Sequence, residues 1–175
     1  MLAGRVRLPR PRSRLALVRL IRDLWTLPTN LIGHAAGLLV SGRLPRRVGG
    51  PAAVGWLYPI RSGLGLDWVG AVTLGHAIVH RPGLLDNGTP RARLTLAHEL
   101  AHTRQHDLLG PLYLPLHLLA QAASAVITLG RATIVSRVHD ENPLEQSFIC
   151  IPASATHGPL PDDVDLPELL RAFGV

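Results

Sequence analysis

The sequence predicts an α+β fold in which a small β-sheet packs against one long helix and the helical hairpin that follows it. Residues 48–81 consist of short apolar runs interrupted by Gly and Pro, a pattern typical of β-strands. Residues 90–109 have helical spacing between clear start and stop signals. An uncharged apolar stretch at 112–128 predicts a further helix. With 175 residues, the chain is long enough for one domain with a buried core.

Shifts in composition divide the chain into four segments. Residues 1–12 are rich in Arg and Pro and are expected to form a disordered basic tail. Residues 13–45 are expected to form amphipathic and apolar helices. Residues 46–151 carry the candidate metal ligands, and residues 152–175 form a Pro-rich acidic tail. The functional site is therefore expected within residues 46–151.

The charge of the chain is unevenly distributed. All 18 basic residues are Arg, and ten of them lie in the first 50 residues beside a single acid, Asp23. This basic start lacks interleaved aromatic residues and a recognised nucleic-acid motif, so it would give only salt-sensitive, non-specific binding. We therefore expect no specific nucleic-acid partner.

The cysteine content and the N-terminus limit the compartment. The single cysteine, Cys150, excludes an internal disulfide and a thiolate-rich zinc site. Charged residues interrupt the first apolar run at Arg19, Arg22 and Asp23, so the start of the chain gives no clear signal peptide. We expect a cytoplasmic protein or a peripheral membrane protein.

Residues 13–25 have the spacing of a cationic amphipathic helix. The apolar stripe consists of Leu15, Val18, Ile21 and Trp25. Since Arg14, Arg19 and Arg22 lie mostly off this stripe, the helix could lie on an anionic membrane surface. A helix packed on its own domain explains the pattern equally well. The next apolar stretch, 26–41, has about 15 residues and falls short of the ~20 that span a bilayer.

The clearest strand is predicted over residues 71–80. Its alternation places one set of side chains on a single face: Val72, Leu74, His76, Ile78 and His80. A loop follows at residues 83–88, with Asp-Asn-Gly as its turn. We expect this strand to lie near the functional cleft, where its edge could pair with an extended substrate.

The helix predicted over residues 90–109 has well-defined ends. Thr89 is a good N-cap, and Pro90 stands at the first helical position, where proline is favoured. Gly110 and Pro111 supply the stop. The helix therefore carries the segment His-Glu-Leu-Ala-His of residues 98–102 in its middle.

The helix predicted from about residue 112 to 128 belongs to a longer uncharged stretch, 108–130, whose length would allow a membrane span. A span would put His102 and Glu145 on opposite sides of the bilayer, which contradicts a shared metal site. We therefore expect 112–129 to fold back on the preceding helix. A short third helix is predicted to start at Asn142 and Pro143, again an N-cap followed by proline.

The His-Glu-Leu-Ala-His segment has the spacing of an H-E-x-x-H metal site. Residues four apart share a helix face, so His98 and His102 can converge on one Zn²⁺. Glu99 lies roughly 100° around the helix, beside the ion, where its carboxylate could take a proton from a metal-bound water. Two surface histidines would be the alternative, but the apolar neighbours predict a buried helix, in which His and Glu need partners.

A zinc site needs a third protein ligand, and the pattern leaves the choice open. His106 shares the helix face, but it lies about 12 Å from His98 along the axis, too far to close around the same ion. The downstream candidates are His117, His139, Asp140, Glu141 and Glu145. Glu145 is well placed on the predicted third helix, where it could equally be the N3 residue of a capping box that starts at Asn142.

The run from His98 to Pro115 and the segment Asn-Pro-Leu-Glu at 142–145 resemble bacterial zincin-like metallopeptidases of the gluzincin type. The segments Leu24–Gly33 and Val72–His76 are also similar, so the resemblance covers roughly residues 25–148. It implies His98, His102 and Glu145 as zinc ligands and Glu99 as the general base. Members of this family are largely uncharacterised, so no particular substrate is implied.

Two positions depart from the family pattern. Phe148 stands where the family usually has a small residue. No residue matches the group that stabilises the transition state in well-studied peptidases, for which His139, His106 and Tyr113 are candidates by proximity.

Two functions follow as hypotheses. The first is a zinc-dependent hydrolase, a metallopeptidase that acts on a peptide or protein substrate. The second is a non-catalytic membrane-associated or interaction protein that keeps a structural zinc site. A fourth protein ligand, for which His139 is a candidate, would distinguish the second function, because structural zinc sites are closed.

Overall fold

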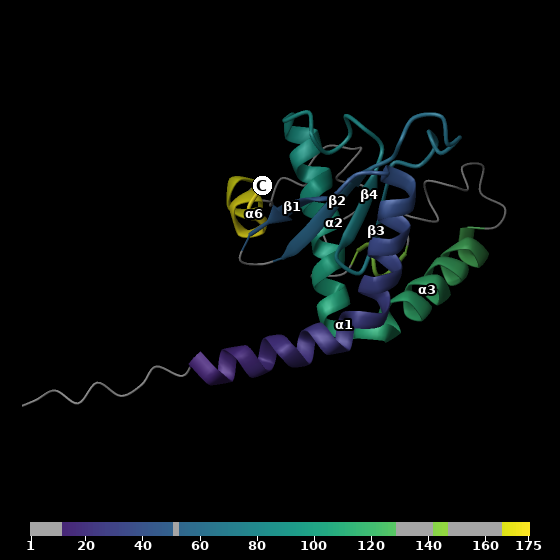
Figure 1. Ribbon diagram of the computed structural model, residues 1–175. Coiled ribbons are helices and arrows are strands. Elements are labelled where there is room, and N and C mark those ends of the chain that lie inside the picture. The colour runs from purple at the N-terminus through teal and green to yellow at the C-terminus, as the bar shows by residue number, and fades with distance from the viewer. Residues whose placement is uncertain (1–11, 51–52, 129–141, 147–165) are drawn as a thin grey trace, which may run out of the picture.

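The computed structural model describes residues 12–50, 53–128, 142–146 and 166–175 (Figure 1). These residues form an α+β fold, as predicted: a four-stranded mixed sheet packs against long helices. The elements are α1 (Arg12–Ser41), β1 (Arg46–Gly49), β2 (Val54–Pro59), β3 (Ala71–Leu74), β4 (Ala77–His80), α2 (Pro90–Leu109), η1 (Gly110–Leu112), α3 (Tyr113–Thr128) and α6 (Leu166–Phe173). The expected disorder of the N-terminal tail falls almost wholly on residues 1–11, which lie outside the described residues.

The strand order in the sheet is β1-β2-β4-β3. Strand β2 pairs with β1 in antiparallel and with β4 in parallel orientation. Strand β3 pairs in antiparallel orientation with β4 and forms one edge of the sheet. All four residues of β4 are buried, as expected for a strand with a neighbour on each side and helices over the sheet.

The prediction of a single strand over residues 71–80 is wrong. The segment is a hairpin, in which Ala71 pairs with His80 and Leu74 with Ala77. The turn is made by Gly75 and His76, and Gly75 has a φ of 63°, a conformation that glycine adopts at little cost. Alternation of apolar and polar residues continues through this two-residue turn, so the pattern could not reveal it. The common face predicted for five of these residues therefore does not exist.

Helix α2 begins and ends where its cap residues predict. The Thr89 hydroxyl accepts a hydrogen bond from the Ala92 backbone N–H at 3.2 Å, and Gly110 follows the last turn with a φ of 55°. The helix packs one face against the sheet, where its apolar residues join the core with Leu57 and Ile78. These core residues of α2 are Leu94, Leu96, Ala97, Leu100 and Ala101.

Helix α1 joins the two N-terminal stretches into one helix, which changes direction partway along its length (Figure 1). Pro28 lies inside the helix and accounts for the change of direction, because proline lacks the N–H that the helix ladder needs. The half after Pro28 lies against the sheet. A Cβ atom at Gly33 would collide with the Leu74 carbonyl oxygen, and one at Gly37 with the Tyr58 ring. The two glycines therefore allow the close approach of α1.

Helices α2, η1 and α3 follow one another without a break, and the axis turns at η1 (Figure 1). Helix α3 confirms the helix predicted over 112–128, but it leaves the end of α2 at an angle instead of lying along it. The combined segment Pro90–Thr128 has 39 residues and is the one described segment long and apolar enough to cross a membrane, by length and composition alone. Only 17% of its most apolar window is buried.

Helix α6 lies within the predicted acidic tail, where the sequence pattern indicates no helix. It packs beside α2 (Figure 1). Phe173 is 6% exposed and belongs to the same core as Leu100. The last ten residues therefore contribute to the core that supports α2.

Candidate metal centre

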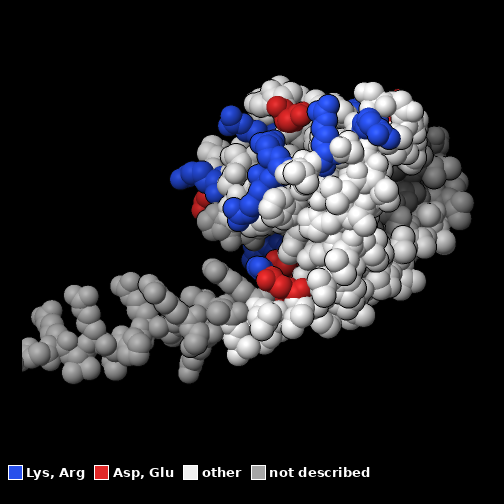
Figure 2. Space-filling view, viewed as in Figure 1, with Lys and Arg blue, Asp and Glu red and all other residues white. Residues whose placement is uncertain are grey.

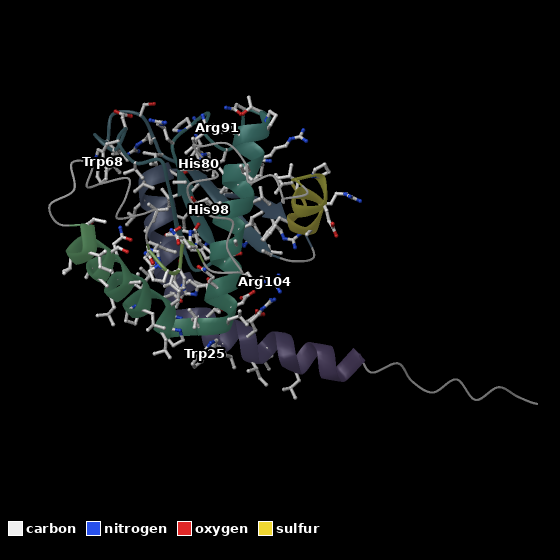
Figure 3. All side chains as sticks on the ribbon, turned by 180° about the vertical axis from the view of Figure 1, so that it is seen from behind. Trp25, Trp68, His80, Arg91, His98 and Arg104 are labelled. Atoms are coloured by element: carbon white, nitrogen blue, oxygen red, sulfur yellow. The ribbon has the colours of Figure 1, made fainter. Side chains whose placement is uncertain are left out.

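Two histidines of α2 meet on its buried face. The Nε2 atoms of His98 and His102 lie 3.1 Å apart, and both side chains are almost fully buried. Their rings are nearly perpendicular, with an interplanar angle of 84°. Figure 3 shows His98 on the inner side of α2, among the side chains that fill the centre of the molecule. The i, i+4 spacing thus brings together two imidazole nitrogens, as the motif predicts.

Glu145 completes the cluster from a distant part of the chain. Its Oε2 atom lies 3.2 Å from His98 Nε2 and 3.0 Å from His102 Nε2, and the residue is 1% exposed. The three donor atoms form a triangle with sides of 3.0–3.2 Å. Donors bound to one tetrahedral zinc ion at 2.0–2.1 Å would lie about 3.3 Å apart, so the triangle fits such an ion closely. The cluster could hold a metal ion.

The other candidate third ligands are placed differently. His117 approaches Glu145 from α3, with its Nε2 atom 3.7 Å from Oε1, the second carboxylate oxygen. His106 is buried on α2 outside the cluster, where its Nδ1 lies 3.4 Å from Thr29 Oγ1. His139, Asp140 and Glu141 lie outside the described residues. Among the described candidates, Glu145 alone reaches both histidines of the motif.

A tight turn at residues 142–146 positions Glu145. The Asn142 side chain accepts a hydrogen bond from the Leu144 N–H at 2.9 Å, and its Nδ2 donates to Gln121 of α3 at 2.9 Å. Asn142 is fully buried. The Glu145 side chain points to the histidines, and the Asn142 side chain contacts the Leu144 N–H, so the geometry favours the ligand role of Glu145 over the alternative of a capping box with Asn142. Any continuation of the predicted helix beyond residue 146 lies outside the described residues.

Gln105 connects this turn to α2. Its Nε2 donates to the Leu144 carbonyl oxygen at 2.6 Å, and its Oε1 lies 2.9 Å from His102 Nδ1. When Nδ1–H donates to this oxygen, the lone pair of His102 is on Nε2, the atom that faces Glu145. The Gln105 contact therefore favours the tautomer of neutral His102 that presents its lone pair to Glu145. The H-E-x-x-H pattern does not single this residue out, although its position three residues after His102 puts it on the same helix face.

Tyr113 and His117 pack behind the cluster. Tyr113 Oη lies 3.2 Å from His102 Nδ1, the nitrogen that faces away from Glu145, and its ring stacks on His117 with centroids 5.5 Å apart. Tyr113 is 3% exposed. It therefore supports the His102 ring from the side opposite the donor atoms, and this is not the place of a group that stabilises a transition state.

Glu99 is held by the edge strand of the sheet. Its Oε2 accepts a hydrogen bond from the Thr73 hydroxyl of β3 at 2.6 Å, and the residue is 7% exposed. This contact joins the motif helix to the strand predicted to lie near the cleft. Thr73 is a second residue of the site that the motif does not indicate.

The negative charge of Glu145 favours a positive charge, either a proton or a metal ion, at the two histidines. Burial alone would lower the pKa of His102, but the hydrogen bond and the negative charge of Glu145 outweigh it and raise this pKa to about 9. By contrast, burial and the nearby His76 lower the pKa of His106 to about 4. A neutral His106 adds no positive charge beside the site. The negative charge of Glu145 that stabilises protonated His102 would also stabilise a metal ion bound to the three donor atoms.

Comparison with known proteins adds one finding. Residues 69–108 match the eCIS core domain. This is a predicted metallopeptidase-like domain of extracellular contractile injection systems. The matched segment contains β3, β4 and nearly all of α2, with His98, Glu99 and His102, but it stops before Glu145. No curated protein and no solved structure matches the chain.

The donor set indicates the chemistry. Two imidazoles and one carboxylate form the set that catalytic zinc sites use, with the fourth position left to water or substrate. The segment that matches this predicted metallopeptidase-like domain is the part of the chain that carries the two histidines. Glu145 as the third ligand depends on the geometry of the cluster.

Proposed function

We propose that this protein is a zinc-dependent hydrolase, a metallopeptidase of the gluzincin type. The observation that carries the proposal is the triangle of His98 Nε2, His102 Nε2 and Glu145 Oε2, with sides of 3.0–3.2 Å in a buried site. The match to a metallopeptidase-like domain over residues 69–108 supports it independently.

Glu99 is the general base in this proposal. When bound, zinc would supply a Lewis acid that polarises the substrate carbonyl and lowers the pKa of its water. Thr73 donates to Oε2 of Glu99 and so fixes the orientation of the carboxylate. The other oxygen, Oε1, then takes the proton of the attacking water and returns it to the leaving amine.

The edge strand β3 would bind the substrate. A peptide in extended conformation can add to an exposed sheet edge through main-chain hydrogen bonds. Strand β3 is an edge strand, and its Thr73 contacts the proposed base directly. An added peptide strand would therefore pass close to Glu99, which favours a peptide or protein substrate over a small molecule.

Hydrolysis of a fluorogenic peptide library by the zinc-loaded protein tests the proposal. We expect Glu99→Gln to retain zinc and to lose at least a hundredfold in turnover, because general-base catalysis contributes typically 10²–10⁴-fold. Arg104→Gln on the same helix is the matched control, since Arg104 is exposed (Figure 3). Equal turnover by Glu99→Gln and the wild-type protein would exclude this role of Glu99.

The burial of all three ligands favours a second candidate, a non-catalytic protein with a structural zinc site. Such a site needs a fourth protein ligand, and His139 is the candidate from the sequence. Zinc retention by His139→Ala separates the two functions. A hydrolase keeps its zinc in this variant, whereas a structural site closed by His139 loses it.

A further inference from the structure

The helices α1 and α3 carry large apolar side chains on their outer faces. On α1, Leu24, Leu31, Ile32 and Leu39 are 56–78% exposed. On α3, Leu118, Leu119, Val126 and Ile127 are 59–67% exposed. A single exposed leucine is ordinary, but contiguous apolar surface of this kind marks an interaction site.

The inner faces of the same helices are small or polar. On α1 the buried positions include Thr26, Thr29 and Ser41, together with the two glycines that contact the sheet. On α3 they are Tyr113 at the start of the helix, which packs behind the metal cluster, and then Ser124 and Thr128, which are almost fully buried. A surface helix in water shows the opposite arrangement, with its apolar stripe toward the core. Small and polar residues between helices and apolar residues outside are typical of helices in contact with lipid.

The two outer faces meet at one end of the molecule. Trp25 of α1 packs on Gly110, the residue that joins α2 to α3. Figure 3 shows Trp25 at this end and Trp68 at the opposite end. Tryptophan is enriched where protein meets the membrane–water interface. Because it contacts Gly110, Trp25 lies at the junction of the two apolar faces, and its side chain is 43% exposed there.

Charge is nearly absent from this side of the molecule. Neither residues 26–41 nor residues 108–128 contain Asp, Glu, Lys or Arg, and each stretch has one histidine, His34 and His117. Figure 2 shows the basic side chains gathered over the upper part of the molecule, and a broad uncharged area below and to the right with one small charged group at its border. We define the apolar face as the outer sides of α1 and α3 together with Trp25.

The sequence next to the apolar face indicates what covers it. Seven of the first 22 residues are Arg, and the first acid of the chain is Asp23. Basic residues beside an interfacial helix attract anionic lipid headgroups, with about 1 kcal/mol for each Lys or Arg near the surface. We infer that the apolar face binds an anionic lipid membrane, with α1 and α3 lying in the plane of its interface.

The orientation along the membrane follows from the inner side of α3. His117 lies 3.7 Å from Glu145, and Gln121 accepts a hydrogen bond from Asn142 at 2.9 Å. One side of α3 is therefore covered by the protein along much of its length, and only the other side is available to lipid. This arrangement suits a helix that lies on a membrane better than one that crosses it. It also places the metal cluster close to the lipid surface, on the protein side of α3.

Flotation of the full-length protein with vesicles tests this inference. Protein diluted from detergent is mixed with vesicles of phosphatidylcholine alone or with phosphatidylglycerol added. We expect the bound fraction to be several times higher on the anionic vesicles and to fall in high salt. The double variant Leu31→Asp/Leu119→Asp should reduce binding at least tenfold. The control Trp68→Asp, at a side chain 82% exposed in the loop before β3, should bind like the wild-type protein.

Two results would overturn the inference. One is flotation of the double variant at the wild-type level, which would show that the apolar face is not the contact. The other is a protein that does not float with either vesicle but sediments as a dimer or larger species, with the double variant monomeric. The apolar face would then be a protein interface. Circular dichroism of the double variant checks that it retains its helices.

Fluorescence locates the contact independently. In the variant Trp56→Phe/Trp68→Phe, Trp25 is the remaining tryptophan. We expect its emission to shift to the blue on anionic vesicles and to be quenched by lipids brominated in the acyl chain. In Trp25→Phe/Trp56→Phe, Trp68 should show neither change. Quenching of Trp68 with no effect on Trp25 would contradict the proposed face.

Discussion

The Gln105 side chain donates a hydrogen bond to the Leu144 carbonyl oxygen at 2.6 Å, across 39 positions of the chain. The same amide also contacts His102 Nδ1 at 2.9 Å. Gln105 therefore links the helix that carries two of the candidate ligands to the turn that carries the third. A contact of this kind sets the geometry of a metal site without touching the ion.

Replacement of Gln105 by Leu should weaken zinc binding about 10–100-fold, the range typical for the loss of a group that orients a ligand. The hydrogen bonds to His102 and to the turn at residues 142–146 are both lost, while the volume of the side chain is nearly kept. Competition with a zinc indicator measures the affinity. Arg104→Leu changes the exposed neighbour and should leave the affinity unchanged. Wild-type affinity in Gln105→Leu would show that the turn docks without this contact.

Replacement of Thr73 by Val should reduce turnover about 10–100-fold and leave zinc content unchanged, since a hydrogen bond to a charged group contributes about 1.5–3 kcal/mol. The variant removes the donor to Glu99 and keeps the shape of the side chain. We expect the loss mainly in kcat. Thr73→Ser keeps the hydroxyl and should restore most of the rate, whereas a Ser variant as slow as the Val variant would assign Thr73 a packing role only.

The helix that carries the motif is well predicted because its signals are local. Thr89, Pro90 and Gly110 lie next to the ends that they determine, and the structure places those ends as expected. The third ligand is different. Glu145 could equally cap its own helix, and the choice depends on the long-range contacts of Gln105 and Asn142, which no local pattern shows.

Two other features show where sequence patterns stop being informative. The alternation from Ala71 to His80 continues through the Gly75–His76 turn, so a hairpin has the same signature as one long strand. On α1, the apolar stripe over residues 13–25 fits a membrane surface and a helix packed on the domain equally well, and it does not reveal that the Thr, Gly and Ser residues of the following stretch fit closely against the sheet. Binary patterning assumes that the side of a helix away from the core faces water, so it cannot by itself identify the inner side of a helix whose outer face is apolar.

Replacement of Gly33 by Ala tests the close approach of α1 to the sheet. At an exposed helix position this change would stabilise the protein by up to about 1 kcal/mol, because Ala has the higher helix propensity. At Gly33 the added Cβ would collide with the Leu74 carbonyl, so we expect a loss of about 1–3 kcal/mol. Urea unfolding measures the difference. The control is Ala35→Gly on the exposed side of α1, which should cost no more than about 1 kcal/mol. A stabilised Gly33→Ala variant would contradict the docking of α1.

The buried His106 predicts a loss of stability in acid. Its pKa falls to about 4 in the folded protein, from about 6.5 in the unfolded chain, so the unfolded chain binds the proton first as the pH drops. With respect to His106, the free energy of unfolding has its full value above pH 6.5 and falls by up to about 3 kcal/mol as the pH drops to 4. Burial lowers the pKa of His34 and His80 as well, and both act in the same direction.

In the metal-free protein, His102 does not interfere with the measurement of this effect. The pKa of His102 is raised to about 9 in the folded protein, so its contribution to stability is fully present below pH 6.5 and is lost only as the pH rises toward 9. The contribution of His102 is therefore constant across the acid range. Urea unfolding at several pH values between 4 and 7 measures how the free energy of unfolding changes with pH. We expect this change to be smaller for His106→Asn than for the wild-type protein. The same pH dependence of the unfolding free energy in both proteins would show that His106 is not the group responsible.

The zinc content of the purified full-length protein is the most direct measurement of the metal site. After incubation with zinc and removal of the excess, we expect about one zinc per chain in the wild-type protein and in Glu99→Gln, as a single site with three protein ligands requires. We expect less than a tenth of this in Glu145→Ala and in His98→Ala/His102→Ala. A wild-type protein that holds no zinc, or a Glu145→Ala variant that holds as much as the wild type, would contradict a metal centre formed by His98, His102 and Glu145.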